Sequence, residues 1–216
     1  MATLALYEKL KEFGEKEYGI TVKFKNESGF MKVLSKILFF NKNFMTTYAS
    51  TIGSTVYFPS RSWVAANPTA AAIILAHELV HVADARKLTA PVFALVYLAP
   101  QLFSLFALFA VVHSLWWLLC LLFLLPWPAL GRAILETRAY SVSCMMHNAI
   151  TGWIPDYTEK FTSPAYYYMW PFAKDMHAAF ATIAALVKQN KLNAVVAPAN
   201  DILAIVTNFY TNNRRT

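Results

Sequence analysis

Two histidines and a glutamate lie within the short segment HELVH, at positions 77–81. On an α-helix His77 and His81 are one turn apart on the same face, so their ring nitrogens can converge on one metal ion. Glu78 lies beside that ion. Two neutral imidazoles bind Zn²⁺, the metal lowers the pKa of a coordinated water, and a neighbouring glutamate accepts its proton. The segment predicts a zinc site with Glu78 as general base.

The surroundings of HELVH favour this interpretation over chance. The segment follows AAAIILA in a predicted helix, where a solvent-exposed His/Glu face would have no reason to be embedded in alanine and isoleucine. The alternative is a pair of structural histidines in the core.

Zinc needs a third protein ligand, and the sequence offers Glu136. The long metzincin pattern requires glycine at position 84 and histidine at position 87, where this chain has Asp84 and Lys87. Glu136 instead opens the predicted helical segment ETRAYSVSC and can approach from a second helix. The alternative is that Glu136 is a surface partner of Arg132 or Arg138.

One long segment accounts for the low charge of the chain, which is 57% hydrophobic and only 14% charged, against about a quarter in typical soluble domains. Residues 88–131, a run of 44, contain no Asp, Glu, Lys or Arg. As a helix this run would measure about 66 Å, enough to cross a hydrocarbon core of about 30 Å twice. Because Glu136 must return to the side of His77 and His81, the run is predicted to be a transmembrane hairpin, bent near 112–114 and kinked at Pro100.

Charge and cysteine usage indicate the side of the membrane. Arg86, Lys87 and Arg132 flank the hairpin, so the positive-inside tendency places the zinc domain on the cytoplasmic side. Cys120 and Cys144 form no disulfide framework and are expected to be reduced. The net charge of +7 is dispersed, which favours contact with a lipid bilayer and argues against nucleic acid. The N-terminus shows no cleavable signal peptide.

The remaining pattern predicts an α+β fold that is mainly helical with a small β-sheet. Its zinc domain comprises residues 1–87 and 132–216, interrupted by the apolar hairpin at 88–131. Asn67 and Pro68 are the expected N-cap and first residue of the helix that carries HELVH. The strand just ahead of that helix can bind an extended peptide or be plain sheet. Helices are predicted at 3–18, 30–40, 68–87, 133–146, 173–189 and 201–210, and strands at 20–24, 44–48 and 54–58.

HELVH, a pair of apolar spans and a helix with Glu-x-x-Ala, within 46–144, resemble the membrane-associated gluzincin metallopeptidases of the HtpX and CAAX prenyl-protease kind. The resemblance implies a zincin-like domain with His77, His81 and Glu136 as zinc ligands and Glu78 as general base. It also implies a downstream residue that stabilises the oxyanion, for which Tyr168 and His177 are the candidates.

One position departs from that family, which usually has Asp four residues after the ligand glutamate. Tyr140 occupies this place. Asp84 or Tyr140 is therefore expected to support the ligands, although Asp84 can also orient a neighbouring arginine or be a solvated carboxylate at the helix end.

The sequence thus predicts a zinc-dependent, membrane-associated endopeptidase that hydrolyses peptide bonds of a peptide or protein substrate. Two alternatives are a non-catalytic membrane hairpin protein with a structural zinc site, closed by a fourth ligand such as His147 or His177, and a soluble protease with a buried hairpin. Neither the oligomeric state nor the identity of the substrate follows from these residues.

Overall fold

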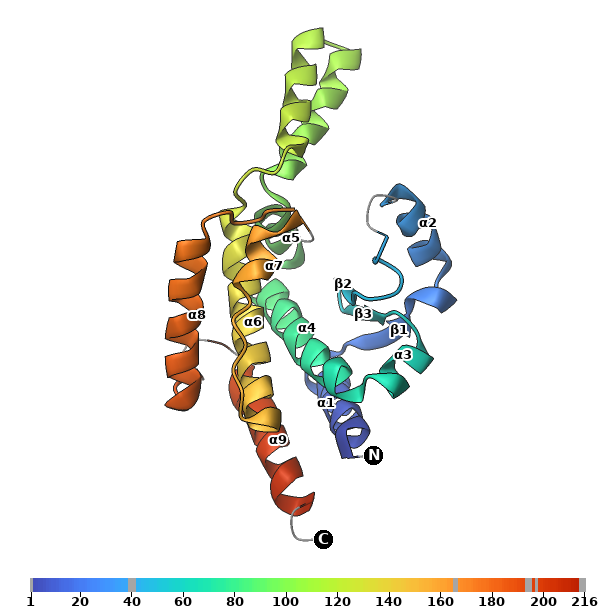
Figure 1. Cartoon of the computed structure of the whole chain (residues 1–216). Coiled ribbons are helices and arrows are strands. Elements are labelled where there is room, and N and C mark those ends of the chain that lie inside the picture. Colours follow the sequence, from blue (N-terminus) through green and yellow to red (C-terminus); the bar gives the residue numbers. More distant parts are fainter. Residues whose placement is uncertain (1, 39–41, 165–166, 193–195, 197, 214–216) are drawn as a thin grey trace.

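The computed structural model describes residues 2–38, 42–164, 167–192, 196 and 198–213, and the fold is α+β and mainly helical, as predicted (Figure 1). Its α-helices are α1 (Ala2–Tyr18), α2 (Gly29–Ile37), α3 (Arg61–Ala66), α4 (Pro68–Leu88), α5 (Ala90–Leu98), α6 (Leu130–Thr151), α7 (Thr158–Thr162), α8 (Ala173–Lys188) and α9 (Ala199–Asn213). The 3₁₀ helices are η1 (Lys25–Glu27), η2 (Gln101–Val111) and η3 (Leu115–Leu124).

A three-stranded mixed sheet lies on one side of the molecule, made of β1 (Thr21–Phe24), β2 (Ser50–Ile52) and β3 (Thr55–Phe58). The strand order is β1-β3-β2, with β1 parallel and β2 antiparallel to β3. Gly53 has a φ of +61° in the turn between β2 and β3, a conformation that glycine adopts without strain. The strand that comes before α4 therefore forms a hairpin whose outer member, β2, is an edge of the sheet.

The predicted strand at 44–48 is wrong, because residues 42–47 form turns and the strand begins at Ser50. The buried Lys25 contacts this segment at Phe44. Its ammonium group donates a hydrogen bond of 2.6 Å to the carbonyl of Phe44 and lies 3.9 Å from the centre of the Phe44 ring. The backbone carbonyl and the ring of Phe44 thus both contact this lysine, and the segment around Phe44 forms turns.

Helix α4 is the centre of the domain, with the sheet and α1 on one side and α6 on the other (Figure 1). It begins at Pro68, as predicted, because proline fits the first helical position, which needs no N–H donor. The expected N-cap is only partly right. Asn67 precedes the helix, but its side chain donates to the Trp63 carbonyl and so ends α3 instead of capping α4.

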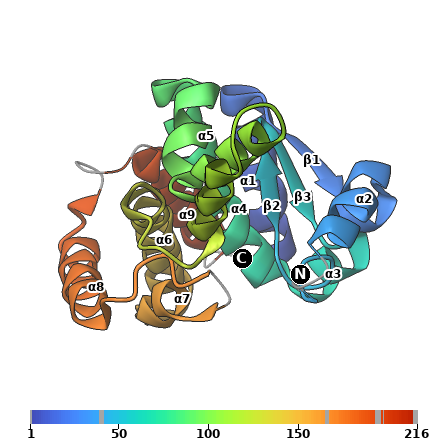
Figure 2. The same cartoon turned by 90° about the horizontal axis from the view of Figure 1, so that it is seen from above.

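The uncharged segment contains α5, η2 and η3, and it folds back on itself between Val111 and Leu115, near the predicted bend. Helices α5 and η2 meet at an angle of 90° beside Pro100. The η2 and η3 helices pack against each other and project from the domain, so that Figure 2 looks almost along them. Within the described residues no single helix is long and apolar enough to cross a membrane, and the bent pair of α5 and η2 meets that criterion by length and composition.

Candidate metal centre

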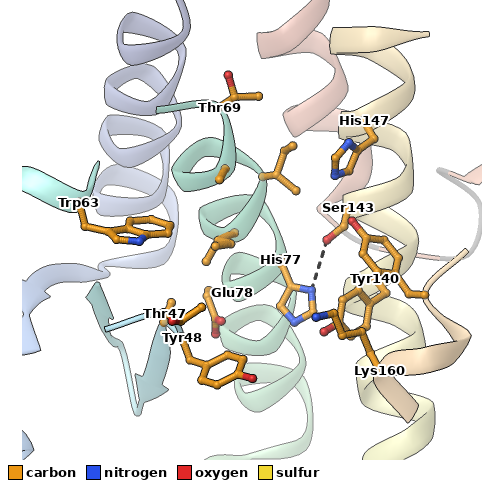
Figure 3. Close-up of a pocket in the computed structure, with 15 residues that line it drawn as sticks. Thr47, Tyr48, Trp63, Thr69, His77, Glu78, Tyr140, Ser143, His147 and Lys160 are labelled. Carbon is orange, nitrogen blue, oxygen red and sulfur yellow. Dashed lines mark hydrogen bonds between the residues drawn. The ribbon is translucent and has the colours of Figure 1, made fainter. Parts of the chain in front are cut away.

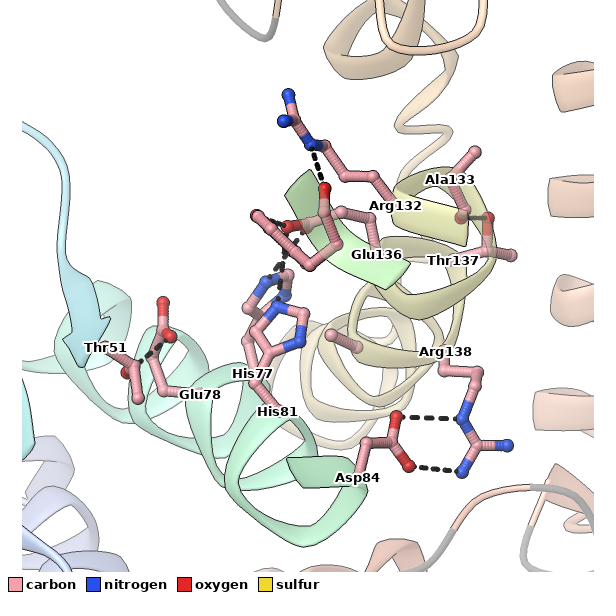
Figure 4. A network of polar contacts seen from close by, with 12 residues as sticks. Thr51, His77, Glu78, His81, Asp84, Arg132, Ala133, Glu136, Thr137 and Arg138 are labelled. Carbon is pink, nitrogen blue, oxygen red and sulfur yellow. Dashed lines mark hydrogen bonds and ion pairs between the residues drawn. The ribbon is translucent and has the colours of Figure 1, made fainter. Parts of the chain in front are cut away.

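Helices α4 and α6 bring His77, His81 and Glu136 together, with potential ligand atoms that all lie within 4.8 Å of one another (Figure 4). The Nε2 atom of His77 is 3.4 Å from one carboxylate oxygen of Glu136, and the Nε2 atom of His81 is 3.5 Å from the other. Only 2% of Glu136 is exposed, so the alternative of a surface partner for an arginine is wrong.

These separations fit three donors around one ion better than direct hydrogen bonds. Donors about 2.0–2.1 Å from a tetrahedral Zn²⁺ lie about 3.3–3.4 Å apart, whereas a charged N–H···O bond is about 2.7–2.9 Å long. The Oε2 atom of Glu136 is buried without a hydrogen-bond partner in the described chain, which is costly unless a cation compensates. The donor set could therefore hold a metal ion.

The charges of the metal-free cluster also favour a cation. Burial alone would raise the pKa of Glu136, but the facing His81 and His77 rings lower it well below its usual range, so the carboxylate is ionised. Burial opposes protonation of His81, yet Glu136, Glu78 and Asp84 raise its pKa to about 9. A proton on His81 therefore takes the place of the metal charge when no metal is bound.

Neighbouring side chains fix the two imidazoles. The Nδ1 atom of His77 lies 3.3 Å from the Ser143 hydroxyl, and the ring of Tyr140 packs edge-on against His77 at 4.6 Å. The Nδ1 atom of His81 has no hydrogen-bond partner among the described residues. Its ring is held instead by edge contacts with Phe93 and Tyr97, at 6.1 and 5.9 Å. Tyr140 thus packs beside a predicted ligand, as expected for the position that departs from the family pattern.

Asp84 orients an arginine, which is one of the roles predicted for it. The side chain is buried and accepts two hydrogen bonds from Arg138, of 2.9 and 3.0 Å, between α4 and α6 (Figure 4). Such a paired geometry fixes both side chains. The ion pair therefore clamps the two ligand-bearing helices together about one turn beyond His81.

Glu78 points away from the ligand cluster towards the edge strand β2. The hydroxyl of Thr51 donates a hydrogen bond of 2.7 Å to Glu78 Oε2 (Figure 4). Two cavities of about 510 and 500 Å³ lie next to this carboxylate, and His77 and Glu78 line both of them. Trp63 and Tyr140 are among the residues that line the first (Figure 3), and residues of β2 and α5 line the second.

Neither candidate for the oxyanion-stabilising role is brought to this cluster. Tyr168 lies in the turn after α7, is 41% exposed, and is absent from the lining of both cavities. His177 lies on α8, where its Nδ1 atom is 2.6 Å from Asp156 and 3.2 Å from the Thr158 hydroxyl. The side chains that do border the first cavity next to His77 include Tyr140, His147 and Tyr157.

Sequence reasoning missed Thr51, Ser143 and Tyr97, which contact Glu78, His77 and Glu136 respectively. One of them carried a signal. Ser143 is seven residues after Glu136, two helical turns along the same face of α6. Thr51 and Tyr97 are brought to the site only by the β2 edge and by the fold of α5.

Comparisons with protein-family models, with curated proteins and with solved structures find no significant match for this chain. The functional argument therefore depends on the residues and geometry of the site.

Proposed function

We propose that the protein is a zinc-dependent, membrane-associated endopeptidase with a zincin-like catalytic domain. The observation that carries this proposal is a three-donor cluster of His77, His81 and Glu136 beside a separate carboxylate, Glu78, that faces two cavities. Zinc sites that only support a fold are closed by four protein ligands, whereas catalytic sites have three and an open position.

A zinc ion held by the three donors would supply a Lewis acid that polarises the peptide carbonyl. Glu78 would accept the proton of the attacking water and pass it to the amide nitrogen as the C–N bond breaks. Thr51 would hold the Glu78 carboxylate in place through its 2.7 Å hydrogen bond. A chain lying across Glu78 would extend into both cavities, which suits cleavage within a peptide.

The lining of the cavities indicates the kind of residue that would flank the cleaved bond. Trp63, Ile73 and Ile74 border the first cavity, while Phe93 and Leu98 border the second. Apolar side chains of the substrate would gain free energy by leaving water at these walls. Peptides with large apolar residues on both sides of the bond are the expected substrates.

The membrane association proposed here depends on the uncharged segment. Large apolar side chains along η2 and η3 are exposed, among them Leu108 at 70%, Leu115 at 75% and Trp116 at 78%. Exposed apolar side chains that follow one another along the same hairpin favour a partner of low polarity. A lipid bilayer supplies it, with the zinc domain on the cytoplasmic side.

The rival function, a structural zinc site in a non-catalytic hairpin protein, requires a fourth protein ligand. Among the residues that the structure describes, the candidate group has three members, and His147 and His177 are not part of it. A group of three protein ligands would leave one position on the ion for water or substrate, which supports the catalytic proposal.

The test compares Glu78→Gln with the wild-type protein, purified in detergent and loaded with zinc. Cleavage of fluorophore-quenched casein and zinc content per chain are both measured. Loss of a general base should lower the rate by about 10²–10⁴-fold, while the three ligands continue to bind about one zinc per chain. Glu12→Gln, on the exposed face of α1, is the matched control and should leave both unchanged. Wild-type rates in Glu78→Gln would show that the mechanism is wrong.

A further inference from the structure

Tyr97 connects the uncharged segment to the metal centre. It lies on α5 and its hydroxyl donates a hydrogen bond of 2.5 Å to Glu136 Oε1. The same residue lines the cavity between α5 and β2. A side chain from the predicted hairpin therefore contacts one of the three proposed ligands directly.

The position of Tyr97 is held from several directions. The Nε atom of Arg132 donates a hydrogen bond of 3.0 Å to the Tyr97 carbonyl, and its guanidinium lies 5.2 Å from the centre of the Tyr97 ring. A second nitrogen of Arg132 reaches the Gln101 side chain at 3.5 Å. The Phe93 ring stacks on Tyr97 with centres 5.7 Å apart, and both rings touch His81. These contacts orient the hydroxyl before any metal binds.

Glu136 needs such a partner because its carboxylate must present oxygen atoms to a shared ion at a defined angle. Among the described residues, Tyr97 donates a hydrogen bond to this carboxylate, while the two imidazoles face it at 3.4 and 3.5 Å, distances that suit a shared ion. When the imidazoles bind a metal through Nε2, neither ring can donate a hydrogen bond to Glu136 from that atom. The phenol of Tyr97 then remains to orient the carboxylate.

We propose that Tyr97 is a positioning residue of the metal centre, which holds the Glu136 carboxylate in its ligating orientation. The centre is then incomplete without the uncharged segment. This inference rests on the proposed function in one respect, since it takes the His77, His81 and Glu136 cluster as a zinc site. Hydrogen bonds to metal ligands typically change metal affinity by about 10–100-fold when they are lost.

The experiment measures zinc affinity of the full-length protein in detergent by competition with a chromophoric chelator. Tyr97→Phe removes one oxygen atom and keeps the ring contacts with His81 and Phe93. It should bind zinc about 10–100-fold more weakly than the wild type. Cobalt(II) replaces zinc in a second measurement, and its visible absorption bands should shift in Tyr97→Phe, because they report ligand geometry at the ion.

Two further variants separate positioning from a general loss of structure. Tyr210→Phe removes the same oxygen from a partly buried tyrosine on α9 and should match the wild type in both measurements. Arg132→Gln releases the Tyr97 carbonyl while keeping the phenol, and should weaken zinc binding in the same direction by a smaller factor. It serves as a second test if Tyr97→Phe folds poorly.

The outcomes distinguish this inference from the proposed function. Equal zinc affinity and equal cobalt spectra in wild type and Tyr97→Phe would overturn the inference and leave the peptidase proposal standing. Weaker zinc binding in Tyr97→Phe, in a protein that cleaves no casein, would support the inference and remove the peptidase proposal. A folded wild type that binds no zinc after metal resupply would overturn both.

Discussion

Gly131 lies where α6 passes the backbone of α5, and alanine at this position should separate the two helices. A Cβ atom built on Gly131 would be 2.5 Å from the carbonyl oxygen of Val96 and 2.6 Å from its Cγ1 atom. The first of these neighbours is backbone and cannot rotate away. Ordinary van der Waals contact begins at about 3.4 Å, so α5 must move by about 0.9 Å to accept the methyl group.

That movement has two measurable consequences. Overpacking at a close helix contact costs about 1–3 kcal/mol of unfolding free energy. Because Tyr97 follows Val96, a shift of about 0.9 Å would also lengthen its 2.5 Å hydrogen bond to Glu136 to about 3.4 Å, where little of its strength remains. Gly131→Ala should therefore both unfold more easily and bind zinc more weakly, with a loss of affinity close to that of Tyr97→Phe.

Thermal unfolding of the metal-free protein and zinc competition measure the two effects separately. Gly29→Ala is a matched control at the start of α2, where an added Cβ atom meets no atom within 4 Å. It should leave zinc affinity unchanged. Unchanged stability together with wild-type zinc affinity in Gly131→Ala would refute the close packing of α5 on α6 and the route from Gly131 to the metal centre.

Two other predictions concern charge at the centre. Asp84→Asn keeps the shape of the side chain but removes the charge that pairs with Arg138. Because Arg138 is 28% exposed, we expect the free energy of unfolding, measured with a chemical denaturant, to fall by only about 1–3 kcal/mol. A change below about 0.5 kcal/mol would show that the pair does not clamp α4 to α6. Burial lowers the pKa of His81, but Glu136 raises it to about 9, so the ring is protonated at neutral pH when no metal is bound. Zinc would have to displace this proton. Zinc affinity should therefore be about tenfold stronger at about pH 8 than at about pH 7. The same raised pKa stabilises the metal-free fold fully below about pH 6.5, and this contribution disappears as the pH rises through about 9. A zinc affinity that is the same at about pH 7 and at about pH 8 would contradict a protonated His81.

The helices and the pairing of the two histidines could be predicted because each depends on local spacing. His77 and His81 are one turn apart wherever α4 lies, so their convergence needed only a helical segment. Glu136 was indicated by its place at the start of a second predicted helix, and the return of residues 88–131 was inferred from it. The resulting triad is the group that the structure brings together.

The sequence could not predict contacts made by residue types that carry no motif, such as threonine and tyrosine. Thr51 lies on β2, which starts at Ser50 rather than at position 44, and there it donates a hydrogen bond to Glu78. The predicted strands at 44–48 and 54–58 left Thr51 in the turn between them, so its contact with Glu78 was missed. Lys25 is 0% exposed, which is unusual for a lysine, and the sequence pattern does not predict its burial.

The path of the uncharged segment unites the membrane proposal with the metal centre. Helix α4 ends at Leu88, α5 then packs against both α4 and α6, and α6 begins at Leu130. Both ends of the segment thus lie at the same pole of the domain, where Tyr97 meets Glu136. If the hairpin enters a bilayer, any force on η2 and η3 acts on α5, and through Tyr97 on a proposed zinc ligand. Zinc affinity of the wild type should then differ between detergent micelles and anionic lipid vesicles, and this difference should be smaller in Tyr97→Phe. An equal difference in both proteins would show that the segment anchors the chain in the bilayer without affecting the metal centre.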